Sequence, residues 1–258
     1  MRYKINYACV SNIGKVRSMN QDNLICDGLY MDSETAQKPF FKNGSVSPKD
    51  FPLFGIFDGM GGEELGEVAS LIAAQESAKI KGECESVTAL SEYCERTNAA
   101  ICTYAEENGV SAMGTTAAML LFSKDEITLC NIGDSKIFRL ASGRIDQISM
   151  DHVAIAVYGR KPPLTQHLGV PPEILLIDPY FSRGGYAEGD KYLICSDGLT
   201  DMVGNEEINE IVNGKPVEEA VELLVQKALE NGGKDNITII LLEIKQNDNR
   251  LFAMFKNK

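Results

Sequence analysis

Four aspartates stand where apolar, strand-like runs of the chain begin or end, and they are its strongest chemical signal. They are Asp58, Asp134, Asp197 and Asp235. A strand end exposes its side chain at the rim of a sheet, and a neighbouring glycine lets another group approach the backbone closely. Carboxylates gathered at such a rim repel one another unless a cation lies between them. The pattern therefore predicts a divalent-metal site made of hard oxygen ligands.

The elements that would position these aspartates are short strands in consecutive hairpins, with helices arriving in pairs. Apolar and β-branched content predicts strands at 3–10, 22–27, 53–57, 115–122, 126–132, 136–141, 144–148, 174–178, 191–196 and 236–244. Helical spacing predicts helices at 63–81, 86–107, 205–212 and 217–230. The polar stretch 32–52 reads as a loop. This order favours an α+β fold of antiparallel sheets covered by helices over a βαβ winding.

Composition limits the partners. The chain has 258 residues, as expected for one domain, and a net charge of −12 from 25 basic and 37 acidic residues. We therefore expect neither nucleic acid nor an anionic membrane surface as the main partner. Seven cysteines without a Cys-x-x-Cys pair, no signal peptide and no membrane-spanning apolar run predict a cytoplasmic protein.

Each signal taken singly has a simpler interpretation. An Asp-Gly pair after a strand is most often a turn, and a lone arginine such as Arg17 is usually a surface charge. The two histidines, His152 and His167, are too few for a zinc site and read as ordinary loop residues. Gly59-x-Gly61 lies between a strand and a helix, but Glu64 stands where a dinucleotide fingerprint needs its third glycine. A nucleotide-binding domain is thus a weak alternative.

Six short motifs, taken in chain order, are more specific than any one of them. They are Arg17-Ser18-Met19-Asn20-Gln21-Asp22, Phe57-Asp58-Gly59-Met60-Gly61-Gly62, Gly114-Thr115-Thr116, Gly133-Asp134-Ser135-Lys136, Ser196-Asp197-Gly198-Leu199-Thr200-Asp201 and Asp235-Asn236-Ile237-Thr238. Together they resemble the metal-dependent protein Ser/Thr phosphatases of type 2C, the PPM family, in its bacterial form. The resemblance covers nearly the whole chain and implies two packed antiparallel sheets flanked by helices, an α-β-β-α sandwich.

The resemblance also implies metal ligands. Asp58 is expected to bridge two metal ions, with the carbonyl of Gly59 as a further ligand. Asp197 and Asp235 would complete the shell of one ion, and Asp22 would serve the other, partly through water. The ions would be Mn²⁺ or Mg²⁺, two in each active site.

Two further positions follow from the same resemblance. Asp134 is similar to the ligand of a third, weaker metal in bacterial members, and Arg17 would hold the phosphoryl oxygens. A guanidinium suits that task because its planar fork makes bidentate contacts. Met60 stands where many eukaryotic members have histidine, so leaving-group protonation is expected to fall to a metal-bound water.

The expected activity is hydrolysis of phosphoserine and phosphothreonine by direct attack of a metal-bridging hydroxide. Expected partners are phosphoproteins, including a cognate Ser/Thr protein kinase, and we expect a monomer. Residues 1–244 would form one catalytic domain with a flap-like insertion at 150–172, followed by a polar tail at 245–258. The alternative is a type 2C-like binding or regulatory module that has lost catalysis.

Overall fold

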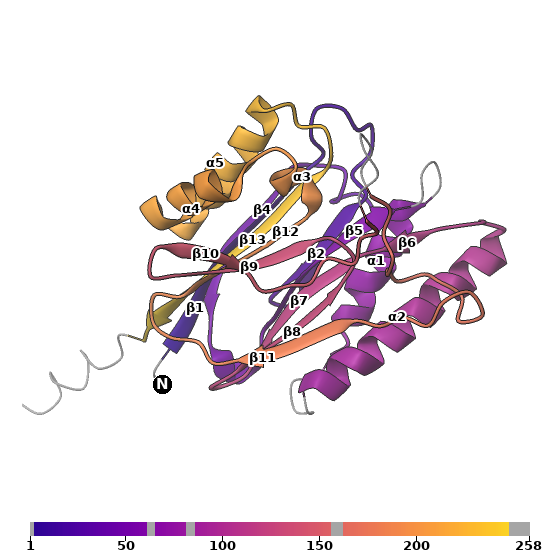
Figure 1. Ribbon diagram of the computed structural model, residues 1–258, viewed down its shortest axis with the longest axis horizontal. Coiled ribbons are helices and arrows are strands. Elements are labelled where there is room, and N and C mark those ends of the chain that lie inside the picture. Colours follow the sequence, from indigo (N-terminus) through magenta and orange to yellow (C-terminus); the bar gives the residue numbers. More distant parts are fainter. Residues whose placement is uncertain (1–2, 61–64, 81–85, 156–161, 248–258) are drawn as a thin grey trace, which may run out of the picture.

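The computed structural model describes residues 3–60, 65–80, 86–155 and 162–247, which form a layered α+β sandwich (Figure 1). The first sheet has six strands in the spatial order β10 (Arg144–Gln147), β9 (Lys136–Ala141), β12 (Lys191–Cys195), β13 (Ile237–Gln246), β1 (Tyr3–Asn12) and β4 (Phe40–Val46). The second has seven, in the order β11 (Tyr180–Gly184), β8 (Ile127–Ile132), β7 (Ala117–Phe122), β5 (Leu53–Met60), β2 (Asp22–Cys26) and β3 (Leu29–Tyr30), with β6 (Gly114–Thr115) paired to β5. Neighbouring strands run antiparallel, as predicted.

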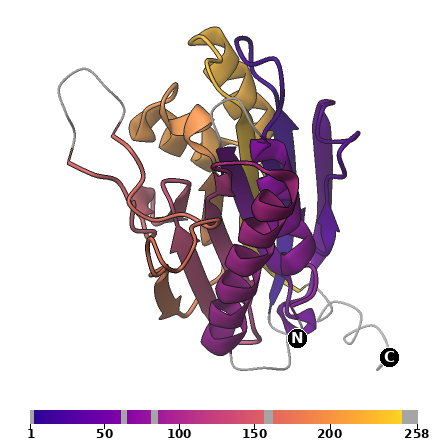
Figure 2. The same ribbon diagram turned by 90° about the vertical axis from the view of Figure 1, so that its right-hand side faces the viewer.

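Helices cover the outer face of each sheet. The first sheet carries α4 (Asn205–Gly214) and α5 (Val217–Glu230), and the second carries α1 (Gly66–Ser77) and α2 (Ser86–Asn108). Figure 1 and Figure 2 show α2 on the outer face of its sheet, running roughly along the direction of the strands. The α-β-β-α sandwich implied by the sequence is therefore confirmed. In the described parts of the chain, no helix has the length and apolar character needed to span a membrane.

Three apolar layers hold the sandwich together. The central layer lies between the sheets, where the ring of Phe122 packs nearly perpendicular to those of Phe54 and Tyr192. The two outer layers lie between each sheet and its helices. Strand β13 lies in the middle of the first sheet, and its first six residues are buried. Ile237, Ile239 and Leu241 face the outer layer, and Ile240, Leu242 and Ile244 face the central layer.

The predicted loop at 32–52 is wrong in part, because it contains the edge strand β4 and a short 3-10 helix at Pro48–Asp50. Strand β4 pairs only with β1 among the described strands, and most of its residues are exposed. A half-exposed edge strand keeps polar residues, so its apolar signal is weak. Its Gly44 faces the ring of Tyr7, which leaves no room for a side chain there.

The strand predicted at 174–178 is also wrong. This segment is irregular, and the strand β11 lies further on, at Tyr180–Gly184. Ile174 and Leu176 are each 76 % exposed, so the apolar run that suggested a strand is not buried. A short helix that the sequence did not predict, α3 (Asp197–Thr200), begins directly after β12.

The observed bounds of other elements differ slightly from the predicted ones. The helix predicted at 63–81 spans Gly66–Ser77, and its residues 63, 64 and 81 lie outside the described ones. The described parts of the predicted flap are irregular and make isolated bridges, Val153 with Leu164 and Thr115 with Leu168. Residues 156–161 of the flap and 248–258 of the tail lie outside the described residues.

Candidate metal centre

A pocket of about 320 Å³ lies at one end of the sandwich, where strands of both sheets terminate. Six of the seven predicted site residues line it: Arg17, Asp58, Gly59, Asp134, Asp197 and Asp235. The seventh, Asp22, lies next to it on β2, directly opposite Asp58 on β5. Residues that are far apart in the sequence therefore meet at this rim, as the strand-end pattern predicted.

Asp22 forms the buried side of the site. Its carboxylate is 2 % exposed and accepts a hydrogen bond of 2.8 Å from the Ser196 hydroxyl. The same hydroxyl oxygen accepts the backbone N–H of Thr238, so Ser196 joins the end of β12 to the start of β13. Burial raises the pKa of Asp22 to about 6. A cation beside this carboxylate would relieve that cost by favouring the charged form.

The backbone of Asp58 is fixed from three sides by the Gly114-Thr115-Thr116 motif. The Asp58 N–H donates to the Thr116 hydroxyl at 3.0 Å. The Asp58 carbonyl accepts from the Thr116 N–H at 2.9 Å and from the Thr115 hydroxyl at 3.0 Å. These bonds leave the Asp58 carboxylate as the part of the residue that faces the pocket.

Two glycines let separate segments approach the site closely. A Cβ on Gly59 would lie 2.1 Å from the carbonyl oxygen of Gly66, and one on Gly198 would lie 1.9 Å from that of Asn236. Both distances are far below van der Waals contact. The glycines beside Asp58 and Asp197 are therefore required by packing, which the sequence pattern predicted in general terms.

The outer side of the site is an ion pair. The Arg17 guanidinium donates to the Asp235 carboxylate at 2.7 Å, and the two side chains are 48 % and 32 % exposed. Asn236 holds the loop that carries Arg17, because its side chain accepts from the Gln21 N–H and donates to the carbonyl of Met19. Arg17 thus lies in the pocket, next to a predicted metal ligand.

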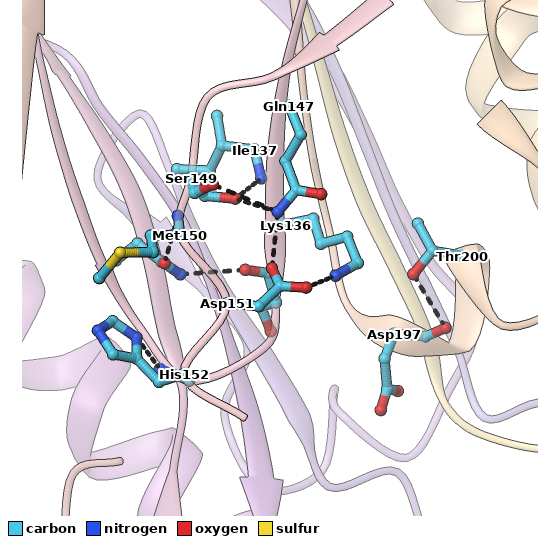
Figure 3. A network of polar contacts seen from close by, with 12 residues as sticks. Lys136, Ile137, Gln147, Ser149, Met150, Asp151, His152, Asp197 and Thr200 are labelled. Carbon is cyan, nitrogen blue, oxygen red and sulfur yellow. Dashed lines mark hydrogen bonds and ion pairs between the residues drawn. The ribbon is translucent and has the colours of Figure 1, made fainter. Parts of the chain in front are cut away.

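Asp134 follows a glycine with a left-handed backbone, Gly133, whose φ is +102°. His152 fixes that turn with two hydrogen bonds. Its backbone N–H donates to the Gly133 carbonyl at 2.9 Å, and its imidazole Nδ1 accepts the Gly133 backbone N–H at 3.3 Å. His152 is 7 % exposed, so it is a buried part of the support of Asp134 and not the ordinary loop residue expected. Lys136 pairs with Asp151, one residue before the histidine; Figure 3 shows this network beside Asp197.

The donor set fits Mg²⁺ or Mn²⁺ because it consists of carboxylate and carbonyl oxygens. It does not fit a nitrogen- or sulfur-rich zinc site, since His152 is used by Gly133. Among the described residues, no three acidic, imidazole or thiol side chains already converge on one point. The carboxylates surround a shared space, and like charges at such a site repel one another. Arg17 forms an ion pair with one of them, Asp235.

Several supporting residues were not assigned a role from the sequence. Ser196, Thr116 and Asn236 all lie within the quoted motifs, but nothing in their spacing indicates which atoms they would bond. The sequence indicates them only by position: Ser196 and Asn236 are adjacent to an aspartate, and Thr116 belongs to the motif that bonds the backbone of Asp58. They bond Asp22, the Asp58 backbone and the Arg17 loop respectively.

The described residues thus form an α-β-β-α sandwich with a pocket lined by carboxylates at one end. The sequence model of the protein phosphatase 2C family matches residues 42–241, and the chain belongs to this family. It is 28 % identical to the serine/threonine phosphatase stp of Listeria monocytogenes over 253 residues, which cover 89 % of this chain and 92 % of the relative.

A second curated relative is longer. The chain is 28 % identical to the serine/threonine protein phosphatase PstP of Mycobacterium tuberculosis over 95 % of its own length, but it spans only 46 % of that relative. The crystal structure of the catalytic domain of PstP in complex with 2 manganese ions superposes with a TM-score of 0.75, at 28 % identity, over 94 % of this chain and 99 % of that one. Stp1 from Staphylococcus aureus superposes with a TM-score of 0.76 at 25 % identity, over 92 % and 94 %.

Proposed function

We propose that this chain is a metal-dependent protein phosphatase that hydrolyses phosphoserine and phosphothreonine. One observation carries the proposal: among the described residues, carboxylates from both sheets and the guanidinium of Arg17 line the same open pocket. The carboxylates can hold cations, and the guanidinium can hold a phosphoryl group. Membership of the protein phosphatase 2C family and the likeness to the manganese complex of PstP support it.

We assign the metal ligands as follows. Asp58 would bridge two ions, with the Gly59 carbonyl as a further ligand, and Asp22 would complete the buried side. Asp197 and Asp235 would complete the open side. In support of this, Asp22 and Asp58 are cross-strand neighbours, and the other ligands line the same pocket.

Asp134 would hold a third, weaker ion. Gly133 and His152 fix the turn between β8 and β9 that presents Asp134, whereas Asp22 and Asp58 are direct cross-strand neighbours. We therefore propose that it binds last and is the least important of the ligands for activity.

When bound, Mn²⁺ or Mg²⁺ would supply a hydroxide nucleophile near neutral pH and neutralise charge on the phosphoryl oxygens. The side chains of the pocket do the rest. Arg17 would bind the phosphoryl group, and its present partner Asp235 would turn to a cation instead, which frees the guanidinium for substrate. Met60 lines the pocket and cannot donate a proton, so no assigned side chain acts as general acid.

The proposal extends to the partners of the chain. We propose phosphoproteins as substrates, a cognate Ser/Thr kinase among them, a monomeric state and a cytoplasmic location. The alternative, a family member without catalysis, requires the loss of a ligand. None of the predicted ligand positions has lost its oxygen donor, which favours the enzyme.

The test is hydrolysis of a phosphothreonine peptide with Mn²⁺, with and without a chelator. We expect activity that the chelator abolishes and that fresh Mn²⁺ restores. A phosphotyrosine peptide of the same sequence serves as the matched substrate and should be cleaved much more slowly. A protein that binds Mn²⁺ but cleaves neither peptide would support the non-catalytic alternative.

A further inference from the structure

A second cavity, of about 200 Å³, lies between the edges of the two sheets and shares no lining residue with the candidate metal centre. Its apolar walls are Leu120, Leu129, Ile148 and Tyr192, and its polar groups include Arg139 and Ser182. It opens beside β11, the outermost strand of the second sheet. The cavity is thus a separate feature of the sandwich and needs its own explanation.

One of the lining residues on β11 is a glycine with open space around it, Gly184. Ser182 and Gly184 of β11 lie opposite Leu129 and Ile127 of β8, whose side chains belong to the central layer. Cross-strand neighbours share a face, so positions 182 and 184 face the space between the sheets. A Cβ on Gly184 would meet no atom within 4 Å, and its backbone is not in the left-handed region. A larger side chain there would close the cavity without backbone strain.

Arg139 supplies the polar end of the cavity. It lies on β9 two residues after Ile137, which belongs to the central layer, so its side chain also faces that layer. Its Nη2 donates to the carboxylate of Asp190 at 2.8 Å. Its Nε is buried and has no hydrogen-bond partner among the described residues. A buried N–H without an acceptor is costly, so a bound group with an accepting oxygen would be stabilised at this position.

The charges around the cavity are already balanced. Arg139 is paired with Asp190, and Arg183 at the rim is paired with Glu126 at 3.5 Å. An incoming carboxylate would therefore approach two existing carboxylates and find no uncompensated cation. A neutral group with an accepting oxygen satisfies the Arg139 Nε–H without that repulsion.

We infer that this cavity binds a small neutral molecule with an apolar body and one hydrogen-bond-accepting oxygen, of the chemical class of aromatic amides. The volume supports this class, because a dry apolar cavity of about 150 Å³ holds benzene. The larger cavity here accommodates a six-membered ring and a carboxamide. The ring packs on the apolar walls, and the carbonyl oxygen accepts from Arg139.

The site has a structural route to the candidate metal centre. Ile148 lines the cavity, and its N–H donates to the carbonyl of Ile137. The next residue, Ser149, accepts the Ile137 N–H and leads directly to Asp151, which pairs with Lys136. These contacts connect the wall of the cavity to the segment that contains Asp151 and His152.

The experiment is an NMR titration of the full chain with benzamide, toluene and benzoate as probes. We expect benzamide to shift the amide signals of Ser182, Gly184 and Gly185 saturably, with a dissociation constant on the order of 1 mM. Toluene, which lacks the acceptor, and benzoate, which carries a charge, should each bind at least about fivefold more weakly. Equal or tighter binding of either probe would overturn the assignment, and so would the absence of saturable binding by benzamide.

Two variants locate the binding. Gly184→Leu should close the mouth and weaken benzamide binding at least about tenfold, whereas Gly214→Leu, at another unobstructed glycine, should leave it unchanged. Arg139→Lys keeps a cation for Asp190 but removes the Nε–H, and should weaken binding about fivefold. Because it does not fill the cavity, it tests the acceptor independently of Gly184→Leu. Wild-type affinity in both variants would place the probe elsewhere and refute the inference.

Discussion

The buried and open sides of the candidate metal centre are built differently. On the buried side, Asp22 is 2 % exposed and bonded to Ser196, and the backbone of Asp58 is fixed by two threonines. On the open side, Arg17 and Asp235 form an ion pair with 48 % and 32 % of their side chains exposed. Groups held by buried bonds are set before a ligand arrives, whereas an exposed pair can exchange partners. The buried side therefore fixes geometry, and the open side responds to what binds.

The largest effect should come from the buried side. Asp58→Asn removes the charge of the proposed bridging ligand, and we expect kcat/KM for a phosphothreonine peptide at saturating Mn²⁺ to fall at least about a thousandfold. Asp146→Asn, at an exposed aspartate on β10, is the matched control and should be close to wild type. If Asp58→Asn kept a tenth of the activity, the assignment of the bridging ligand would fail.

Metal binding should stabilise the fold. Mn²⁺ at about 100 times its dissociation constant should raise the free energy of unfolding by about 2.7 kcal/mol. In a chain of this size that corresponds to a rise in Tm of about 5 to 10 °C, measurable by calorimetry with and without a chelator. Asp58→Asn should lose most of this rise. An equal rise in the variant would mean that the ion binds elsewhere.

The open side should separate catalysis from metal affinity. Arg17→Gln should lower kcat/KM about tenfold to a hundredfold, because it removes the charge-assisted bonds proposed for the phosphoryl group. The Mn²⁺ concentration for half-maximal activity should stay the same or fall, since Asp235 loses a competing cation. Arg17→Lys should recover only part of the activity because it lacks the planar fork. A higher Mn²⁺ requirement in Arg17→Gln would contradict this division of roles.

A positioning residue on the buried side should show the opposite behaviour. Ser196→Ala removes the hydrogen bond to Asp22, and we expect the Mn²⁺ concentration for half-maximal activity to rise about tenfold. Activity at saturating Mn²⁺ should largely recover, as a loss of catalytic groups would not. Ser45→Ala, at an exposed serine on β4, should change neither quantity.

The smallest effect should be that of the Arg17–Asp235 pair on stability. Without metal, Arg17→Gln should change the free energy of unfolding by less than about 1 kcal/mol, because exposed ion pairs contribute little and are screened by salt. Urea denaturation at low and high salt measures this. A loss well above that value would show that the open side is as rigid as the buried one.

The sequence predicted the fold class and the gathering of site residues, and it did so from different kinds of signal. Buried elements with a clear apolar pattern were predicted within two residues of their bounds. Examples are α5, with apolar residues at helical spacing, and β13, with a nearly continuous apolar run. The edge strand β4 was missed because Lys42, Asn43, Gly44 and Ser45 interrupt its apolar residues, and the exposed run 174–178 has the apolar composition of a buried strand. An apolar pattern predicts a strand or a helix correctly only where tertiary packing buries that segment.

The gathering of the candidate site residues in one pocket was predictable for a related reason. Asp58 and Asp197 are followed by glycines that close packing requires, and this leaves a trace in the sequence. The hydrogen bonds of Ser196 and His152 leave no such pattern in the sequence. Ser196 bonds Asp22, which is 174 residues away, and His152 bonds Gly133 because tertiary packing brings their two loops together. Which hydroxyl or imidazole supports which carboxylate depends on register and loop geometry, and these are set only by tertiary packing.

The pairing of the first and last described strands, β1 with β13, bears on when a newly made chain could begin to work. Arg17 and its partner Asp235 are 218 residues apart, and Gln21 and Asn236 are 215 apart. The pocket therefore cannot assemble on the ribosome until nearly the whole domain has emerged, and contacts of such long range also slow folding. A nascent or truncated chain that ends before Asp235 lacks one side of the pocket, so under the proposed function it could not hydrolyse phosphoproteins during its own synthesis.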